Sequence, residues 1–191
     1  MKYALPMFAA LVLAACQPAA DETQTPAGDD PSSQSAGQSQ GPADAPVQLI
    51  VLDPEGLRLV DEATGSTRLV PFGSPADEVL TTITAIAGAP IERGGMDECG
   101  PGPLTFAEYT NGLRLWFAAS GFSGWESTGE ITTMDGLSAA ANRAELEAAG
   151  ITEFTRDTLD DEFQAGDING MMEPEGQEVA LLYVGDNCFM R

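Results

Sequence analysis

Most of the residues in this sequence that could carry out chemistry are carboxylates, and few are bases or thiols. The chain of 191 residues holds 30 aspartates and glutamates, 8 lysines and arginines, three cysteines and no histidine, and Lys2 is its single lysine. These counts exclude nucleophiles that depend on an imidazole or an amine base, and they exclude imidazole metal sites. They indicate no cofactor. A net charge of −22 repels phosphate backbones, so we expect no nucleic-acid partner.

The first cysteine, Cys16, closes a short apolar segment. Residues 1–15 place Lys2 before about a dozen apolar residues, which is the layout of a signal peptide and too short for a membrane span. Residues 13–16, Leu-Ala-Ala-Cys, resemble the lipobox of bacterial lipoproteins. That resemblance implies cleavage before Cys16 and fatty acylation of its thiol. The alternative is an ordinary secretory signal with a chance cysteine.

The lipobox resemblance also implies a location. Acylated Cys16 would anchor the chain in a lipid bilayer on the periplasmic side of the cell envelope. Gln17 at the second mature position favours the outer membrane over the inner one. Residues 16–46 would then be the lipidated, acidic tether, because residues 17–46 contain no Leu, Ile, Val, Met or aromatic residue and are expected to be disordered.

The other two cysteines, Cys99 and Cys188, form an even pair in a chain expected to be exported. Such a pair predicts a disulfide bond. A redox or metal-binding pair is the alternative. The sequence has no Cys-x-x-Cys motif, no histidine and no base beside either cysteine that would lower a thiol pKa, so we favour the structural bond.

Carboxylates are common enough to raise two further possibilities. One acidic group could bind Ca²⁺ through oxygen ligands; its members are Asp157, Asp160, Asp161, Glu162 and Asp167. The segment 167–170 lacks the acid spacing of an EF-hand, which favours a solvated acidic edge. A hydrolase that uses paired carboxylates is also conceivable, but no pair stands out in the sequence.

Residues 47–191 are long enough for one folded domain. Alternating apolar residues predict its first strands, at 47–52, 56–60 and 68–72. A helix is predicted next, with Ser74 as the N-cap and Pro75 as the first helical residue, ending at Gly88 and Pro90.

The strongest local signal is a hairpin centred on Asn111-Gly112, between the runs 104–110 and 113–119. A two-residue turn would place Thr110 opposite Leu113 and Phe106 opposite Phe117. The other face of this hairpin would then carry three side chains of types common at interfaces: Tyr109, Arg114 and Trp116. We expect this face either to bind a protein partner or to be covered, with Trp116 in the core. Residues 122–125 would add a third strand.

A second round of similar elements follows. It starts with a short apolar run at 131–134 and continues with a helix that ends at Gly150. Asn142 and Glu145 form a capping-box pattern at the start of this helix, although Ser138 is an alternative cap. Short strands are predicted at 151–156, 162–164 and 178–184. The pattern indicates a weak repeat of about 56–128 and 129–191.

This order of elements is similar to tandem-repeat proteins of the β-lactamase-inhibitor-protein type and to the SmpA/OmlA envelope lipoproteins. The chain also resembles uncharacterised bacterial envelope proteins in four features: Gly56-Leu57, Phe72-Gly73, Cys99 and Cys188. The resemblance implies an α+β fold of two tandem units, each a short helix packed on an antiparallel sheet, joined by a disulfide. In the inhibitor-like proteins a sheet face grips a partner protein.

These observations predict a non-catalytic envelope lipoprotein that binds or scaffolds an envelope protein through a sheet face. A purely structural envelope lipoprotein is the first alternative. A hydrolase that relies on carboxylates alone is the second, disfavoured by the lack of histidine and lysine.

Overall fold

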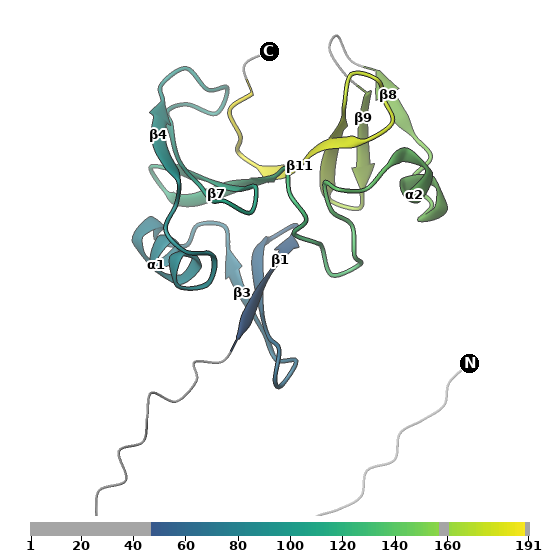
Figure 1. Cartoon of the computed structure of the whole chain (residues 1–191). Coiled ribbons are helices and arrows are strands. Elements are labelled where there is room, and N and C mark those ends of the chain that lie inside the picture. Colours follow the sequence, from purple (N-terminus) through teal and green to yellow (C-terminus); the bar gives the residue numbers. More distant parts are fainter. Residues whose placement is uncertain (1–46, 157–160, 190–191) are drawn as a thin grey trace, which may run out of the picture. The chain divides into compact units, whose positions relative to one another are not determined.

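The computed structural model describes residues 47–156 and 161–189. Their fold is α+β, with two antiparallel sheets and two helices (Figure 1). The predicted signal peptide at 1–15, the acylation site Cys16 and the predicted tether to residue 46 lie outside the described residues, so the structure does not test them.

The first three strands form a small sheet in the order β1-β2-β3, and all of its pairs are antiparallel. The strands are β1 (Gln48–Asp53), β2 (Gly56–Asp61) and β3 (Thr67–Pro71). They confirm the three predicted strands to within one or two residues. Gly56 begins β2 where the backbone of β3 approaches closely, since a Cβ there would lie 2.1 Å from the Val70 carbonyl oxygen.

Helix α1 (Ala76–Ala87) packs against β1 and β7 and buries Val79 and Ile83. The prediction that Ser74 caps this helix is wrong. Pro75 is the residue at the N-cap, with an extended ψ of 131°, so the helix starts one residue later than predicted. Ser74 lies outside the first turn, and its hydroxyl donates a hydrogen bond to the Pro71 carbonyl oxygen (2.7 Å).

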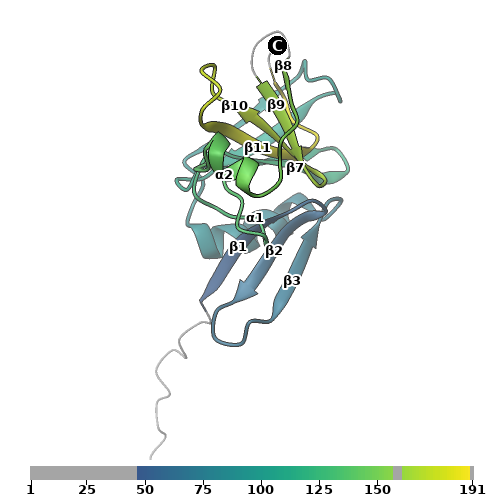
Figure 2. The same cartoon turned by 90° about the vertical axis from the view of Figure 1, so that its right-hand side faces the viewer.

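The remaining strands form one antiparallel sheet of eight strands in the order β4-β5-β6-β7-β11-β10-β9-β8. Figure 2 shows it from the side of its last strands. The strands are β4 (Glu92–Met96), β5 (Leu104–Glu108), β6 (Leu113–Ala118), β7 (Gly121–Ser127), β8 (Phe154–Arg156), β9 (Asp161–Ala165), β10 (Ile168–Met172) and β11 (Val179–Gly185). The pairing of β7 with β11 makes the sheet continuous, so the two predicted units do not appear as separate sheets.

Helix α2 (Arg143–Ala148) confirms the predicted capping box. The Asn142 side chain accepts a hydrogen bond from the Glu145 N–H (3.1 Å), and the Glu145 carboxylate accepts one from the Asn142 N–H (2.9 Å). Ser138 instead accepts a hydrogen bond from the Ala140 N–H (3.2 Å). The short apolar run at 131–134 forms no strand, and its Thr133 forms an isolated bridge to Leu52.

The main core lies between the two sheets and the two helices. It collects apolar side chains from both sheets and from α1 and α2, including Leu57, Ile83, Leu115, Trp125, Leu146 and Leu182. Trp125 is fully buried, and its Nε1 donates a hydrogen bond to the Asp53 carbonyl oxygen (2.9 Å). This bond joins the eight-stranded sheet to the end of β1.

Candidate functional site

The β5–β6 hairpin forms at the predicted place but in a different register. Tyr109 donates its N–H to the Leu113 carbonyl (2.8 Å), so the loop has three residues, Thr110 to Gly112. The Gly112 N–H bonds the Tyr109 carbonyl (3.1 Å), and Gly112 has a φ of 79°. This is a turn followed by a glycine bulge, a common three-residue hairpin loop. Asn-Gly therefore predicted the hairpin correctly but not its loop length.

The one-residue shift changes which side chains share a face. Phe106 lies opposite Trp116 and Glu108 lies opposite Arg114, while Ala107 lies opposite Leu115. We call the side of the eight-stranded sheet that packs on the main core the inner face, and the opposite side the outer face. A one-residue slip moves every side chain of a strand to the other face, which is why the predicted grouping fails.

The predicted interface residues are thus separated. Tyr109 lies on the inner face and is 1% exposed, whereas Arg114 and Trp116 lie on the outer face and Trp116 is 0% exposed. The prediction of one face that carries all three side chains is wrong. Of the two possibilities left open for Trp116, the structure shows a core residue. Arg114 alone reaches the surface, with 35% of its side chain exposed.

Arg114 is the centre of a group on the outer face that we call the Arg114 cluster. Its members are Phe106, Glu108, Arg114, Trp116 and Glu126. The guanidinium forms an ion pair with Glu108 on the neighbouring strand and lies 3.5 Å from Glu126. It also lies over the rings of Phe106 (5.0 Å) and Trp116 (5.8 Å), an arrangement that favours a cation. Four side chains therefore fix the orientation of this one cation.

Glu126 is a carboxylate in a site that would otherwise be apolar. Glu126 is 6% exposed, and its Oε1 accepts a hydrogen bond from the Trp116 Nε1 (2.7 Å). Burial raises the pKa of Glu126 above its ordinary value, opposed by the Trp116 bond and by the charge of Arg114. Glu126 was not among the predicted site residues. A charged residue between Trp125 and Ser127 in an apolar strand was the available signal.

The predicted disulfide Cys99–Cys188 is present and lies on the outer face. Cys99 precedes β5 and Cys188 follows β11, and both pack in a small cluster with Leu104 and Trp116. The chain leaves β11 on the side of the sheet opposite α1 (Figure 1). The ring of Phe189 meets the ring of Tyr183 edge-on, with centroids 4.8 Å apart. The C-terminal segment thus lines one part of the outer face.

The other part of the outer face belongs to β9, β10 and β11. The register places Tyr183 beside Glu126 and Asn169, and Met171 beside Leu181 and Glu162. Tyr183, Met171 and Leu181 are half-buried, so each shows part of an apolar or aromatic side chain to solvent.

The described members of the acidic group, Asp161, Glu162 and Asp167, do not assemble as a cation site. Asp161 forms an ion pair with Arg143 (2.7 Å), and the Arg143 guanidinium lies 3.8 Å from the centre of the Phe154 ring. Asp167 is exposed, and residues after it form β10 rather than a binding loop. Asp157 and Asp160 lie outside the described residues. Within residues 47–156 and 161–189, no three acidic or cysteine side chains gather closely enough to hold a metal ion.

Two hollows lie away from the outer face. One of about 780 Å³ lies between β1, the end of α1 and the segment 128–132. The second, of about 690 Å³, lies beside α2 and is lined by Leu137, Leu146, Ile151 and Ile168, with Glu145 and Asp135 as its carboxylates. Both are open to solvent.

Comparison of the chain with protein-family models, with curated proteins and with solved structures finds no match. Neither helix of the described residues has the length and apolar character needed to cross a membrane.

Proposed function

We propose that the protein is a non-catalytic lipoprotein of the cell envelope that binds a partner protein through the outer face of its eight-stranded sheet. The observation that carries this proposal is the makeup of that face around Arg114. Phe106 is half-buried against Arg114, whose orientation is already fixed. Met171, Leu181 and Tyr183 are half-buried on the β10 and β11 part of the same face.

The solvent side of an antiparallel sheet is usually polar. Aromatic residues, methionine and arginine are the types enriched at protein interfaces, and arginine and tyrosine are frequent among the residues that dominate binding energy. Because Glu108, Phe106 and Trp116 already hold Arg114, little side-chain entropy remains to be lost when a partner docks. The composition and the rigidity of this face support a role in protein binding.

The finer architecture that we propose is a tandem repeat. Helix α1 precedes the four-stranded meander β4 to β7, and α2 precedes the meander β8 to β11. The two meanders meet at β7 and β11 in opposite order. This arrangement supports two units at about 56–128 and 129–191, and it supports the resemblance to inhibitor-like proteins, in which a sheet face grips a partner protein.

A carboxylate hydrolase is supported less well. Glu108 and Glu126 are the pair of carboxylates that the fold brings to one cation, so they are the pair to consider. Both already interact with Arg114, and Glu126 is 6% exposed. An acid that is buried and hydrogen-bonded to Trp116 positions Arg114 rather than reaching a substrate bond.

The anchor is part of the same proposal. The Leu-Ala-Ala-Cys sequence at 13–16 supports acylation of Cys16, and a disulfide supports an oxidising compartment such as the periplasm. Gln17 favours the outer membrane. Mass spectrometry of the native protein tests this: we expect an N-terminal fragment that begins at Cys16 and carries fatty acyl groups. A native chain that retains Met1 and a free Cys16 thiol would contradict it.

Position-specific photo-cross-linking in intact cells tests the binding face. A photoreactive amino acid placed at Met171 should capture one protein of defined mass. The matched control is Glu147, which is exposed on α2 and away from the outer face; the same photoreactive group there should capture no such protein. Cross-links from neither position would favour the purely structural lipoprotein, and equal capture from both would refute the choice of face.

A further inference from the structure

β1 has one edge that its own sheet leaves unpaired. On the β2 side, the Glu62 N–H donates to the Val47 carbonyl (3.0 Å); on the other side, the Leu52 N–H donates to the Thr132 carbonyl (2.9 Å). Backbone groups of successive residues in an antiparallel pair point to alternate edges. The N–H and C=O groups of Gln48 and Ile50 therefore point the same way as the Leu52 N–H. In the described part of the chain, the bridge from Leu52 is the single backbone pairing on this edge.

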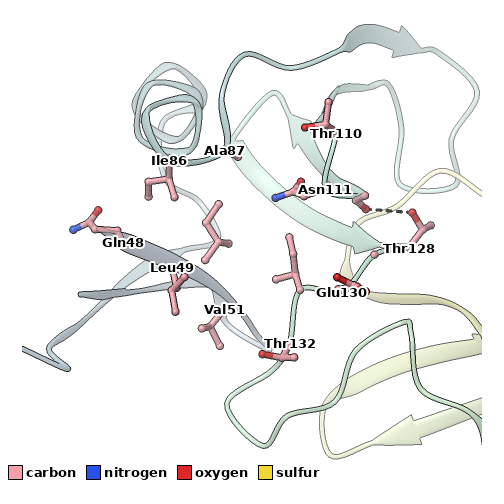
Figure 3. Close-up of a pocket in the computed structure, with 14 residues that line it drawn as sticks. Gln48, Leu49, Val51, Ile86, Ala87, Thr110, Asn111, Thr128, Glu130 and Thr132 are labelled. Carbon is pink, nitrogen blue, oxygen red and sulfur yellow. Dashed lines mark hydrogen bonds between the residues drawn. The ribbon is translucent and has the colours of Figure 1, made fainter. Parts of the chain in front are cut away.

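This edge forms one wall of the hollow of about 780 Å³ (Figure 3). Segment 128–132 forms the opposite wall, and the end of α1 contributes Ile86 and Ala87. The two walls meet where Leu52 bonds Thr132, so the chain itself begins a strand pairing that stops after one residue. Beyond that point the hollow is a groove that runs along Gln48 and Ile50.

The side chains of β1 that line the groove point alternately to the two faces of the strand. Figure 3 shows Gln48 on the side of β1 toward Ile86, and Leu49 and Val51 on the opposite side. In an antiparallel pair, a residue directly opposite Ile50 places its side chain on the same side as Ile50. There it would meet Ile86 and Ile131, which favours an apolar residue. The next residue would lie beside Leu49, which is 47% exposed.

The charge of the groove also constrains its occupant. Glu130 is the one charged residue among those that line it. Residues 47–191 hold seven arginines and 25 carboxylates, a net charge of −18. A segment with a lysine or arginine would complement both the local carboxylate and the field of the domain.

The two walls decide between a peptide and a second copy of this chain. A strand in the groove has β1 on one edge and segment 128–132 on the other. If β1 of a second copy entered, its own β2 would have to occupy the space that segment 128–132 fills. A single extended segment with no further strand attached avoids this clash.

We propose that this groove binds an extended, basic peptide segment of a partner protein as an added strand antiparallel to β1, with apolar side chains at alternate positions facing Ile86 and Ile131. Addition of a strand to an open sheet edge is a general mode of peptide recognition, in which main-chain bonds supply affinity and alternate side chains supply specificity. The proposal does not depend on the outer face, which lies on the other sheet.

Hydrogen exchange on the full chain in detergent micelles tests it. The probe is the acetylated and amidated peptide Lys-Val-Thr-Val-Thr-Val. Binding should slow exchange of the Gln48 and Ile50 amides at least tenfold and leave Met171 and Tyr183 on the outer face unchanged. The control is the same peptide with N-methyl groups on alternate backbone nitrogens, which keeps every side chain and removes the edge bonds; it should not bind.

Two variants at one position separate backbone pairing from side-chain contact. Gln48→Pro removes the outward N–H at an edge position where proline is tolerated, and should weaken peptide binding about tenfold. Gln48→Ala keeps the N–H and should stay within about twofold of the wild type. Near-ultraviolet circular dichroism confirms that both variants fold.

Four results would overturn the proposal: no binding of the probe, equal binding of the N-methylated peptide, protection confined to the outer face, or a dimer of the free chain in which the Gln48 and Ile50 amides already exchange slowly. The last result would assign the edge to a second copy.

Discussion

On the inner face of the large sheet, β6 contributes Leu115 and Phe117 to a core that both sheets and both helices share. On the outer face, the same strand contributes Arg114 and Trp116 to a cluster with two carboxylates and a disulfide beside it. The inner face is held by buried apolar volume. The outer face is held by satisfied polar bonds and one covalent link, so it can remain partly open to solvent without losing its shape. A surface that is rigid before binding is suited to a partner.

This difference predicts that the two tryptophans respond unequally to substitution, with the larger loss on the inner face. Trp125→Ala should lower the free energy of unfolding by about 3–5 kcal/mol, because it leaves a cavity in the main core and removes the bond to Asp53. Urea denaturation followed by circular dichroism measures the change. A loss under about 1 kcal/mol would mean that the main core does not depend on this residue.

The disulfide should come next in size. Replacing both Cys99 and Cys188 by serine opens a link between residues 89 positions apart, and we expect a loss of about 2–4 kcal/mol. The same denaturation experiment measures it. If the outer face relies on this link more than the inner face does, the double variant should also expose the Trp116 region to hydrogen exchange while the Trp125 region stays protected. Uniform exchange across both regions would remove the distinction.

Trp116→Phe removes the indole donor of the outer face together with part of the buried ring volume, so the contribution of the polar bond is separated in a second background. Glu126 would keep its buried position and lose its indole donor, so we expect a loss of about 1–3 kcal/mol. In a double-mutant cycle, Trp116→Phe should cost less in a Glu126→Leu background, because the carboxylate that needs the donor is gone. Strict additivity of the two substitutions would show that the bond contributes nothing.

The smallest effect concerns pH. Burial raises the pKa of Glu126 in the folded state above its ordinary value of 4.5. Between the two pKa values the folded chain therefore holds a proton that the unfolded chain releases. This difference raises the free energy of unfolding, fully so below the ordinary pKa, and the gain is lost as the pH rises through the raised pKa. Groups that face Glu126 are Arg114 and Trp116 on β6, Glu108 on β5 and Tyr183 on β11.

A Glu126→Gln variant isolates the contribution of Glu126 protonation to the free energy of unfolding. The stability of the wild type minus that of the variant should increase on acidification from neutral pH and level off below pH 4.5, because the amide side chain of the variant does not titrate. Denaturation of both proteins across that range measures the difference. A difference that does not change with pH would show that the pKa of Glu126 is unshifted.

Much of the local structure could be predicted because single residues determine it. Asn142 and Glu145 define the start of α2, and Asn111-Gly112 marks the hairpin. The register of that hairpin could not be predicted, since the same two residues serve a two-residue or a three-residue loop. In the observed three-residue loop Gly112 has a φ of 79° and lies so close to Gly129 that a Cβ would come within 2.7 Å of the Gly129 backbone nitrogen. No residue near the turn in the sequence indicates this packing.

Two strands were missed for a shared reason. β4 contains Gly94 and β10 contains Gly170, and glycine in a short segment indicates a turn. In the structure each glycine lies under an aromatic ring of its partner strand, where a Cβ would come within 2.6 Å of Phe106 and 2.1 Å of Phe163. The ring supplies the packing that glycine lacks, and no residue close to the glycine in the sequence indicates that a ring will lie there.

Methionine oxidation in intact cells tests the central claim that the outer face is occupied by a partner. Met171 lies half-buried on that face, and Met134, 60% exposed and outside the sheets, is a control within the same chain. After brief peroxide treatment, mass spectrometry compares their oxidation rates in cells and in the purified protein. Met171 should oxidise more slowly relative to Met134 in cells than it does in the purified protein. Equal ratios for the two residues in cells and in solution would contradict it.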